Sequence, residues 1–264
     1  MLAAECLSLI RGHKLLWVMA RREISTRYAG TAAGVLWAYV QPLLMVAAYY
    51  LVFDVVFAMR LGENAPTKAV GAYLVVGALP WMAFCDALTR GMSSLVEAGG
   101  VLQKNALPPA LFPAKSVVAS MVVYGPLLLA LILGYGPHHG FALALLSMPV
   151  LVGLQFLLCL LLAYALAILA AAVRDTLQVV AFLLSIGIFI SPILFPMSMF
   201  PEQWRWVLWL NPMSALVTGY QAALLQGQWP PASAWLITLT WIACCALVLE
   251  ILLRRSSDQL VDWL

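Results

Sequence analysis

Long stretches without a single Asp, Glu, Lys or Arg alternate with short polar stretches along this chain. The longest runs from Ser116 to Val173, and further uncharged stretches cover residues 28–53, 176–201 and 206–249. On a water-soluble domain, such stretches would leave one continuous apolar surface. A helix crosses the bilayer core with about 20 apolar residues, and a lipid environment requires the backbone to satisfy its own hydrogen bonds. The pattern therefore predicts a helical membrane protein.

We expect six transmembrane helices. Their approximate ranges are 33–58, 70–95, 110–134, 141–172, 176–196 and 233–253. The segment 134–140 combines Gly, Pro and His, and it predicts a tight turn between the third and fourth helices. Of the 264 residues, 64% are hydrophobic and only 9% are charged, which leaves little sequence for a soluble domain. The fold class is therefore all-α, and residues 1–264 form a single polytopic membrane domain.

The basic residues indicate how the chain is oriented. Eleven of the 14 fall on the side that would hold both termini: Arg11, Lys14, Arg21, Arg22, Arg27, Arg90, Lys104, Lys115, Arg174, Arg254 and Arg255. Only Arg60, Lys68 and Arg205 fall on the opposite side. Because cytoplasmic loops are enriched in Lys and Arg, both termini are predicted to be cytoplasmic.

Residues 9–28 form a basic amphipathic stretch before the first long apolar run. Apolar residues such as Leu16, Ala20 and Ile24 share one helical face, while the arginines lie largely off it. Such a helix is expected to lie in the cytoplasmic interface with its cations near lipid phosphates. It is either an orientation anchor or a cationic site that gathers an anionic lipid headgroup.

Two further segments are neither spans nor simple loops. Residues 99–108, with prolines following, predict a short cytoplasmic helix that could dock into a partner, although a solvated loop is the simpler reading. The outer segment 196–225 is apolar but interrupted by prolines, and Met213–Leu225 is too short to cross a bilayer. A re-entrant or interfacial helical hairpin fits this segment, acting either as an outer gate or as a packed plug.

The chain lacks the residues that catalysis would need. The intramembrane acids Asp54, Asp86 and Glu250 lie on three different predicted spans, so they do not suggest one active site. The five cysteines show no spacing typical of metal ligands. No G-x-x-x-x-G-K-[ST] motif occurs, so ATP would have to be hydrolysed by another chain.

Several ordered motifs resemble the permease subunits of type-2 ABC exporters for O-antigen and other bacterial surface polysaccharides. They are the run Ala20–Trp37 followed by Gln41-Pro42-Leu43, then Pro80-Trp81, the segment Lys104–Pro113, Arg174-Asp175, Ser191-Pro192 and Asn211-Pro212. The resemblance covers essentially the whole chain. It departs at Ala171-Ala172-Val173, where the family more often has bulky aromatic residues.

The resemblance implies a homodimeric permease that works with two copies of a separate ABC ATPase subunit. Together they would move a lipid-linked, polyprenyl-pyrophosphate polysaccharide across the bacterial inner membrane. The chain itself would hold no cofactor or metal, because ATP and Mg bind to the ATPase. Membrane lipids are further expected partners, and nucleic acid is not.

The resemblance also suggests roles for particular residues. Arg22 and Arg27 would bind the substrate headgroup, since planar guanidinium groups suit phosphate. The other expected groups are Trp37, Tyr49, Phe53, Phe182 and Phe189 lining a channel, Val101, Leu102, Gln103, Lys104 and Asn105 coupling to the ATPase, and Trp209, Asn211 and Pro212 in the outer gate. Aromatic rings suit a sugar channel because their faces stack on sugar C–H surfaces.

Two other readings remain open on the sequence. The chain could be an ABC permease for a drug or another small molecule. It could also be a polytopic membrane glycosyltransferase or acyltransferase that acts without an ATPase. A neighbouring ATPase gene flanked by glycosyltransferase genes would favour glycan export, and activity of the purified chain alone would favour an enzyme.

Overall fold

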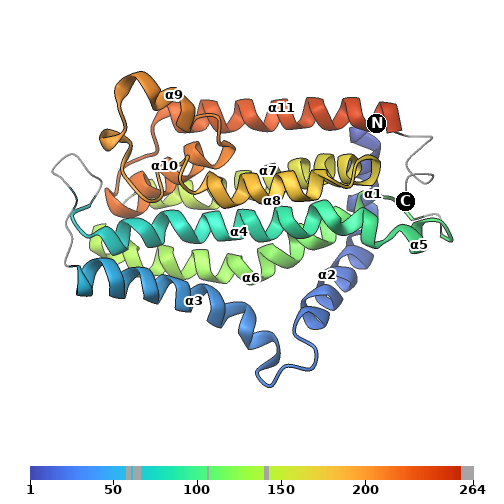
Figure 1. The fold of residues 1–264 in the computed structure, drawn as a ribbon, viewed down its shortest axis with the longest axis horizontal. Helices are drawn as coiled ribbons and strands as arrows, with labels where there is room; N and C mark the ends of the chain where they lie inside the picture. Colours follow the sequence, from blue (N-terminus) through green and yellow to red (C-terminus); the bar gives the residue numbers. More distant parts are fainter. Residues whose placement is uncertain (58–60, 62–66, 106, 140–142, 257–264) are drawn as a thin grey trace.

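The computed structural model describes residues 1–57, 61, 67–105, 107–139 and 143–256, and helices dominate this part of the chain. Figure 1 shows the long helices lying side by side in one bundle. Five segments are long and apolar enough to cross a membrane: Gly34–Val56, Val70–Glu97, Leu111–Tyr135, Leu143–Ala172 and Ala232–Ser256. They correspond to five of the six expected ranges, and they confirm an all-α protein with several membrane-spanning helices.

The helix α4 (Val70–Glu97) lies at the centre of the bundle. It packs against α3 (Trp37–Tyr50), α6 (Leu111–Tyr135) and α7 (Ser147–Ala172), and it buries Tyr73 and Leu88 almost completely. The last long helix, α11 (Ala232–Ser256), packs mainly on α7.

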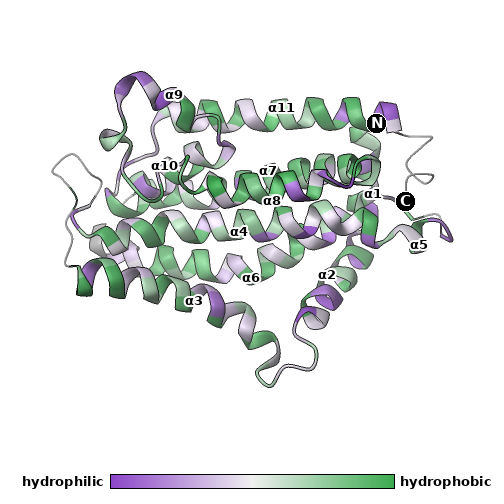
Figure 2. Ribbon diagram, viewed as in Figure 1, coloured by the Kyte–Doolittle hydropathy of each residue, from purple (hydrophilic) through white to green (hydrophobic). Residues whose placement is uncertain are grey.

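The outward faces of the bundle are also apolar, as the hydropathy colours show (Figure 2). Leu133 on α6 and Leu236 on α11 are 60% and 65% exposed. In water such side chains would be costly, whereas lipid tails are as apolar as leucine itself. The surface therefore agrees with a bilayer as the solvent.

The fifth expected span, residues 176–196, is not one continuous helix. α8 (Thr176–Gly187) has 12 residues, which at 1.5 Å per residue makes about 18 Å. That is shorter than the bilayer core of about 30 Å. The chain turns after Gly187, since Pro192 has no N–H to donate and disfavours a helical conformation in the residue before it.

The turn after α8 is held by polar side chains from neighbouring helices. The Pro192 carbonyl accepts hydrogen bonds from the Tyr73 hydroxyl at 2.6 Å and from the Gln221 amide at 2.7 Å. The Phe195 carbonyl also accepts a hydrogen bond from Tyr73, at 3.1 Å. Non-helical backbone at membrane depth needs such protein partners, because lipid offers none.

The amphipathic stretch forms two helices instead of one. α1 (Leu2–Arg11) and α2 (His13–Arg27) meet at Gly12, so the helical region begins earlier than residue 9 and bends within the expected helix. A side chain at Gly12 would lie 3.0 Å from the Ser8 carbonyl oxygen and 3.4 Å from Leu111. Glycine therefore suits the junction between α1 and α2, where a larger residue would crowd the Ser8 carbonyl.

The apolar face of α2 is divided between two environments. Ala20 and Ile24 are buried against Ala119 of α6, whereas Trp17 is 53% exposed. Only part of the face thus remains available to lipid.

The bundle has two distinct ends (Figure 1). One end carries α1, the last turns of α11 and the short helix α5 (Gly99–Leu102), and we call it the α5 end. The opposite end carries α9 (Arg205–Leu208), and we call it the α9 end. The buried helix α10 (Pro212–Leu225) confirms the expected short helix of the outer segment.

Candidate functional site

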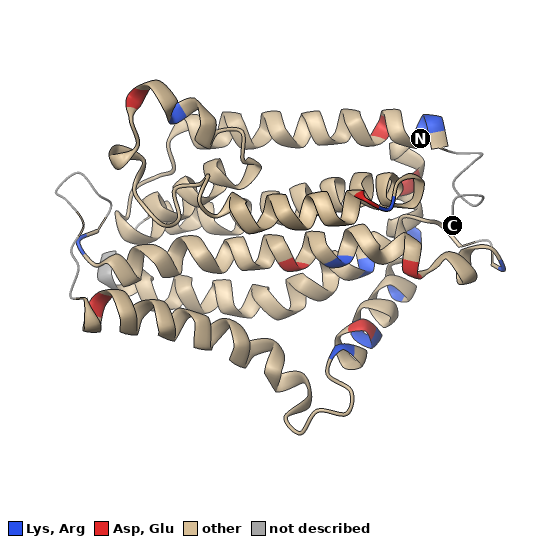
Figure 3. Cartoon of the chain, viewed as in Figure 1, with Lys and Arg blue, Asp and Glu red and all other residues tan. Residues whose placement is uncertain are grey.

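A cleft of about 850 Å³ opens at the α5 end between α2, α4 and α6, and we call it the α2 cleft. Its lining residues are Leu15, Met19, Arg22, Glu23, Thr26, Arg27, Thr89, Arg90, Ser93, Glu97, Val101, Leu107, Phe112, Lys115 and Ser116. Figure 3 shows that many of the charged residues of the described chain gather in this region of the bundle. The cleft is therefore the most polar concave surface among those described, and it adjoins the expected coupling segment at Val101.

Glu23 on α2 joins α2 to α6. Its carboxylate accepts hydrogen bonds from Arg27 at 2.8 Å and from the Ser116 hydroxyl at 3.0 Å. Lys115 Nζ lies 3.5 Å from the same carboxylate. Charge-assisted bonds of this kind are stronger than neutral ones and fix the helices relative to each other.

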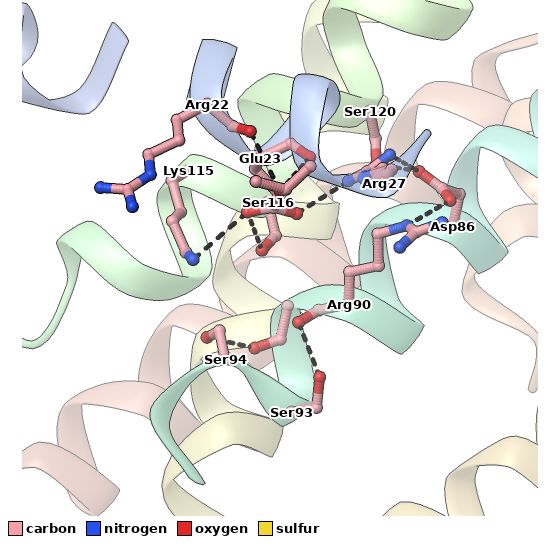
Figure 4. Close-up of polar contacts among 12 residues, drawn as sticks. Arg22, Glu23, Arg27, Asp86, Arg90, Ser93, Ser94, Lys115, Ser116 and Ser120 are labelled. Atoms are coloured by element: carbon pink, nitrogen blue, oxygen red, sulfur yellow. Dashed lines mark hydrogen bonds and ion pairs between the residues drawn. The ribbon is translucent and has the colours of Figure 1, made fainter. Parts of the chain in front are cut away.

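Arg27, the last residue of α2, joins α2 to α4. Its Nη1 lies 3.2 Å from Asp86 Oδ2, while its Nη2 binds Glu23, and its side chain is only 6% exposed. Asp86 also accepts hydrogen bonds from Arg90 Nε at 2.8 Å and from the Ser120 hydroxyl of α6. Figure 4 shows this arrangement, in which Asp86 receives donors from three helices. Asp86 is thus a charged residue within a membrane-spanning helix whose charge is paired. An unpaired carboxylate at this depth would cost considerable free energy.

Arg22 differs from Arg27 although the two are close in sequence. Its side chain is exposed at the rim of the α2 cleft and makes no ion pair or hydrogen bond with the residues that the structure describes. In Figure 4 its guanidinium extends toward the side of Lys115, away from Asp86. Of the two arginines expected to bind a headgroup, Arg22 therefore has the accessible donors, and Arg27 has donors that carboxylates already occupy.

The expected coupling segment combines a buried anchor with exposed side chains. Leu102 is 7% exposed and belongs to the core, whereas Val101, Gln103, Lys104 and Asn105 are exposed. The helical part, α5, ends at Leu102, and the Asn105 side chain donates to the Val101 carbonyl at 3.0 Å. Residue 106 of the expected helix lies outside the described residues. The arrangement presents four side chains to a partner on a firmly packed base.

The expected channel residues lie on two separate helices. Trp37, Tyr49 and Phe53 belong to the segment that includes α3, and Phe182 belongs to α8, with Phe189 in the turn after it. Trp37, Phe182 and Phe189 are 43%, 62% and 61% exposed. Both helices pack on α4. The rings of Trp37, Phe182 and Phe189 face outward, whereas Tyr49 packs partly against the core.

The expected gate residues join the short elements of the α9 end. The Asn211 side chain accepts a hydrogen bond from Met213 N–H at 3.0 Å, which caps α10, and donates to the Gly187 carbonyl at 2.9 Å. Pro212 occupies the first turn of α10, where proline is favoured. The Trp209 carbonyl accepts a hydrogen bond from Trp241 of α11 at 3.1 Å. Asn211 therefore connects the end of α8 with the start of α10.

The sequence does not reveal the partners of Arg27. It offers Asp86 as an intramembrane acid and Arg90 and Lys115 as basic residues that set the orientation, but it does not connect them with one another or with Ser116 and Ser120. One available signal was the spacing of Asp86 and Arg90, because residues four apart on a helix face each other. The contacts from α2 and α6 had no signal, since they depend on how the helices pack.

Comparisons with known proteins agree with this architecture. The family model of the ABC-2 type transporter matches residues 14–225, which include the α2 cleft, α5 and α10. The chain belongs to this family of ABC transporter membrane subunits. It is therefore a multi-pass transport subunit without a catalytic domain of its own, and the family implies a separate ATPase partner.

Several curated relatives share most of their length with the chain. It is 32% identical over 240 residues to the "O-antigen export system permease protein RfbA" of Myxococcus xanthus, covering 87% of this chain and 89% of the relative. A Klebsiella pneumoniae protein of the same name is 22% identical over 216 residues, covering 81% of each. The "Polysialic acid transport protein KpsM" of Escherichia coli is 23% identical over 212 residues, covering 78% and 79%.

Proposed function

We propose that this chain is the permease subunit of an exporter for a lipid-linked surface polysaccharide of the O-antigen class. The observation that carries the proposal is the 32% identity to an O-antigen export permease across 87% of the chain. The expected carrier is a polyprenyl pyrophosphate, and the expected membrane is the bacterial inner membrane. A separate ABC ATPase would supply the energy by hydrolysing ATP with Mg.

The α2 cleft supports a place for the anionic end of such a substrate. Arg22 offers a free guanidinium at the rim, and Lys115 and Arg90 add positive charge to the lining. Arg27 contributes positive potential to the wall, although Glu23 and Asp86 hold its outer nitrogens. Planar guanidinium donors suit phosphate oxygens and bind them more strongly near low-dielectric surroundings.

We further infer that two copies of the chain form the working permease. In the segment Gly34–Val56, only 11% of the most apolar 18-residue stretch is buried inside the bundle. α8 has no buried residue. Both helices therefore have large faces available for a second copy and for a channel between copies. The aromatic residues Trp37, Tyr49, Phe53, Phe182 and Phe189 would then line that channel.

In this assembly the α5 end faces the cytoplasm, with both termini on that side. α8 and the turn after it would form the fifth crossing along the chain, which is the shortest and the one added to the five long helices. The outer gate would be the segment 196–225, with Asn211 controlling the junction of α8 and α10. The coupling segment 99–108 would contact the ATPase through Val101 and the exposed residues that follow it.

A second candidate is export of an apolar small molecule. A separate cavity of about 360 Å³ lies between α4, α7, α8 and α10, and its lining includes Trp81, Phe84 and Leu184, with Asn211 as a polar group. Its size and apolar walls suit a small hydrophobic ligand. This reading would not need the charged α2 cleft for substrate binding.

One experiment separates the two candidates. In a host that lacks its own copy of this permease, Arg22→Gln is expected to reduce surface polysaccharide at least about tenfold, the range for losing a charge-assisted hydrogen bond. Arg21→Gln is the matched control, because Arg21 is exposed on the same helix but does not line the cleft. Normal polysaccharide export by Arg22→Gln would contradict the headgroup site, and export of apolar compounds alone would favour the second candidate.

A further inference from the structure

The helix α4 continues into the coupling segment without losing its hydrogen bonding. Ala98 N–H donates to the Ser94 and Leu95 carbonyls, and Leu102 N–H donates to the Ala98 carbonyl. The side chain of Leu102 is buried in the same core as α4. A displacement of α5 by a partner would therefore be passed to α4 through the packed Leu102 side chain, across a short junction formed by Ala98, Gly99 and Gly100.

The polar link from α4 to α2 runs through Asp86. This carboxylate lies 3.2 Å from Arg27 Nη1, and Arg27 Nη2 lies 2.8 Å from Glu23 on its own helix. One guanidinium thus joins a carboxylate of α2 to a carboxylate of α4. Asp86 and Arg27 are 18% and 6% exposed, so water screens the pair only weakly.

The connection that follows Arg27 imposes little restraint of its own. The link from α2 to α3 is a turn that contains Gly30 with φ 81° and Gly34 with φ 53°. Glycine adopts this left-handed conformation readily, and neither residue has another atom within 4 Å of where a side chain would begin. The C-terminal end of α2 is therefore positioned by its contacts with α4 and α6 and not by this loosely packed turn.

We propose that the Arg27–Asp86 ion pair is the link through which movement of α5 and α4 repositions α2. Arg27 and Asp86 are positioning residues in this account, and Arg22 on α2 is carried along with them at the rim of the cleft. The inference rests on the proposed function, because it requires an ATPase that moves α5. It adds that the energy-coupling segment and the substrate entrance are joined by one buried ion pair.

The contacts suit such a link for two reasons. Arg27 and Asp86 are both largely shielded from water, so separating them would cost electrostatic energy even though Arg27 also binds Glu23 and Asp86 also binds Arg90. The other contacts of α2 go to α6, through Ala20 and Ile24 on Ala119 and through Glu23 to Ser116. These contacts hold α2 on α6 when the link is absent, so breaking the ion pair need not detach the helix.

The test uses the complete permease and ATPase complex in lipid nanodiscs. Thr26→Cys, in a chain whose other cysteines are replaced, places a thiol on α2 where it lines the cleft and is exposed. Its labelling rate with a water-soluble maleimide is measured without nucleotide and after trapping with ATP and vanadate. We expect the two rates to differ by at least about threefold, within the usual range of coupling between sites.

The decisive variant is Arg27→Gln/Asp86→Asn, which removes both charges of the pair. Glu23 keeps Lys115 and Ser116 as partners, whereas Arg90 loses the carboxylate of Asp86. We expect it to assemble and hydrolyse ATP but to show equal labelling rates in the two states. Arg27→Lys keeps the charge but lacks the planar guanidinium whose two outer nitrogens each bind one carboxylate, so it should retain only part of the difference. Glu202→Gln/Arg205→Gln is the matched control, because it removes an ion pair at the α9 end and should keep the full difference.

Two results would overturn the link: equal rates in the parent, or an undiminished difference in the double variant. If the double variant does not assemble, the Arg27→Lys result decides alone. Surface polysaccharide from the Thr26→Cys parent is measured in parallel. A labelling difference without polysaccharide export would keep the link and contradict the proposed substrate.

Discussion

The two ends of the bundle bury polar side chains in different ways. At the α5 end, Arg27, Asp86 and Glu23 form ion pairs between α2 and α4 and within α2. Toward the α9 end, two fully buried polar side chains are neutral: Tyr220 donates to the Gln155 side chain at 2.7 Å, and Gln155 donates to the Pro80 carbonyl at 2.9 Å.

The difference follows from how much water each place admits. Arg27 and Glu23 line the open α2 cleft, and Asp86 and Glu23 retain 18% and 14% exposure. Gln155 and Tyr220 are fully buried, where a charge would cost far more than an amide or hydroxyl. Ion pairs therefore join helices at the α5 end, where water has access. Deeper in the bundle, neutral side chains donate hydrogen bonds to the backbone.

The largest expected effect is at the charged end. Asp86→Leu would leave Arg27 buried with Glu23 as its remaining carboxylate, and it should lower the free energy of unfolding by about 3 kcal/mol. Unfolding by dodecyl sulfate in mixed micelles measures the change. The exposed Glu202→Gln, which also loses an ion pair, is the control and should have no measurable effect. Equal stability of Asp86→Leu and the parent would mean that the charged end is not held by this pair.

A smaller effect is expected at the neutral end. Gln155→Leu leaves the Pro80 carbonyl and the Tyr220 hydroxyl without their partner, and it should cost about 2 kcal/mol. The same unfolding measurement applies, with Gln226→Leu as the exposed control on the segment after α10. A loss larger than that of Asp86→Leu would reverse the ranking of the two ends.

The smallest expected effect is a pH dependence at the α5 end, outside the spans. Burial raises the pKa of Glu5 on α1 above its ordinary value of 4.5, although the Ala110 N–H and the Tyr164 hydroxyl oppose the shift. The undocked carboxyl ionises first as the pH rises, so docking of α1 is strongest below pH 4.5 and weakens as the pH passes through the raised pKa.

Hydrogen exchange of the α1 amides at several pH values, corrected for the intrinsic exchange rate, tests this prediction. Protection should fall with rising pH in the parent and remain constant in Glu5→Gln, which cannot ionise. The exposed Glu202→Gln should behave like the parent. The same pH dependence in Glu5→Gln would assign the effect to another group.

Much of the fold was predictable because lipid imposes simple rules. Uncharged stretches of sufficient length must be helical, so the ranges of α4, α6 and α11 follow from the sequence to within a few residues. The short helix expected at Met213–Leu225 is also present as α10, which begins one residue earlier at Pro212 and is capped by Asn211. These features depend on neighbouring residues along the chain.

The sequence by itself thus determined a helical membrane protein, its long apolar helices and the short helix of the outer segment. Only the tertiary structure showed how the turn after α8 is held, since the Asn211 and Tyr73 side chains that bind it come from distant segments. The same holds for the separation of Arg22 from Arg27. Both are basic residues of one helix, and only the packing of α2 beside Asp86 leaves the first free and pairs the second.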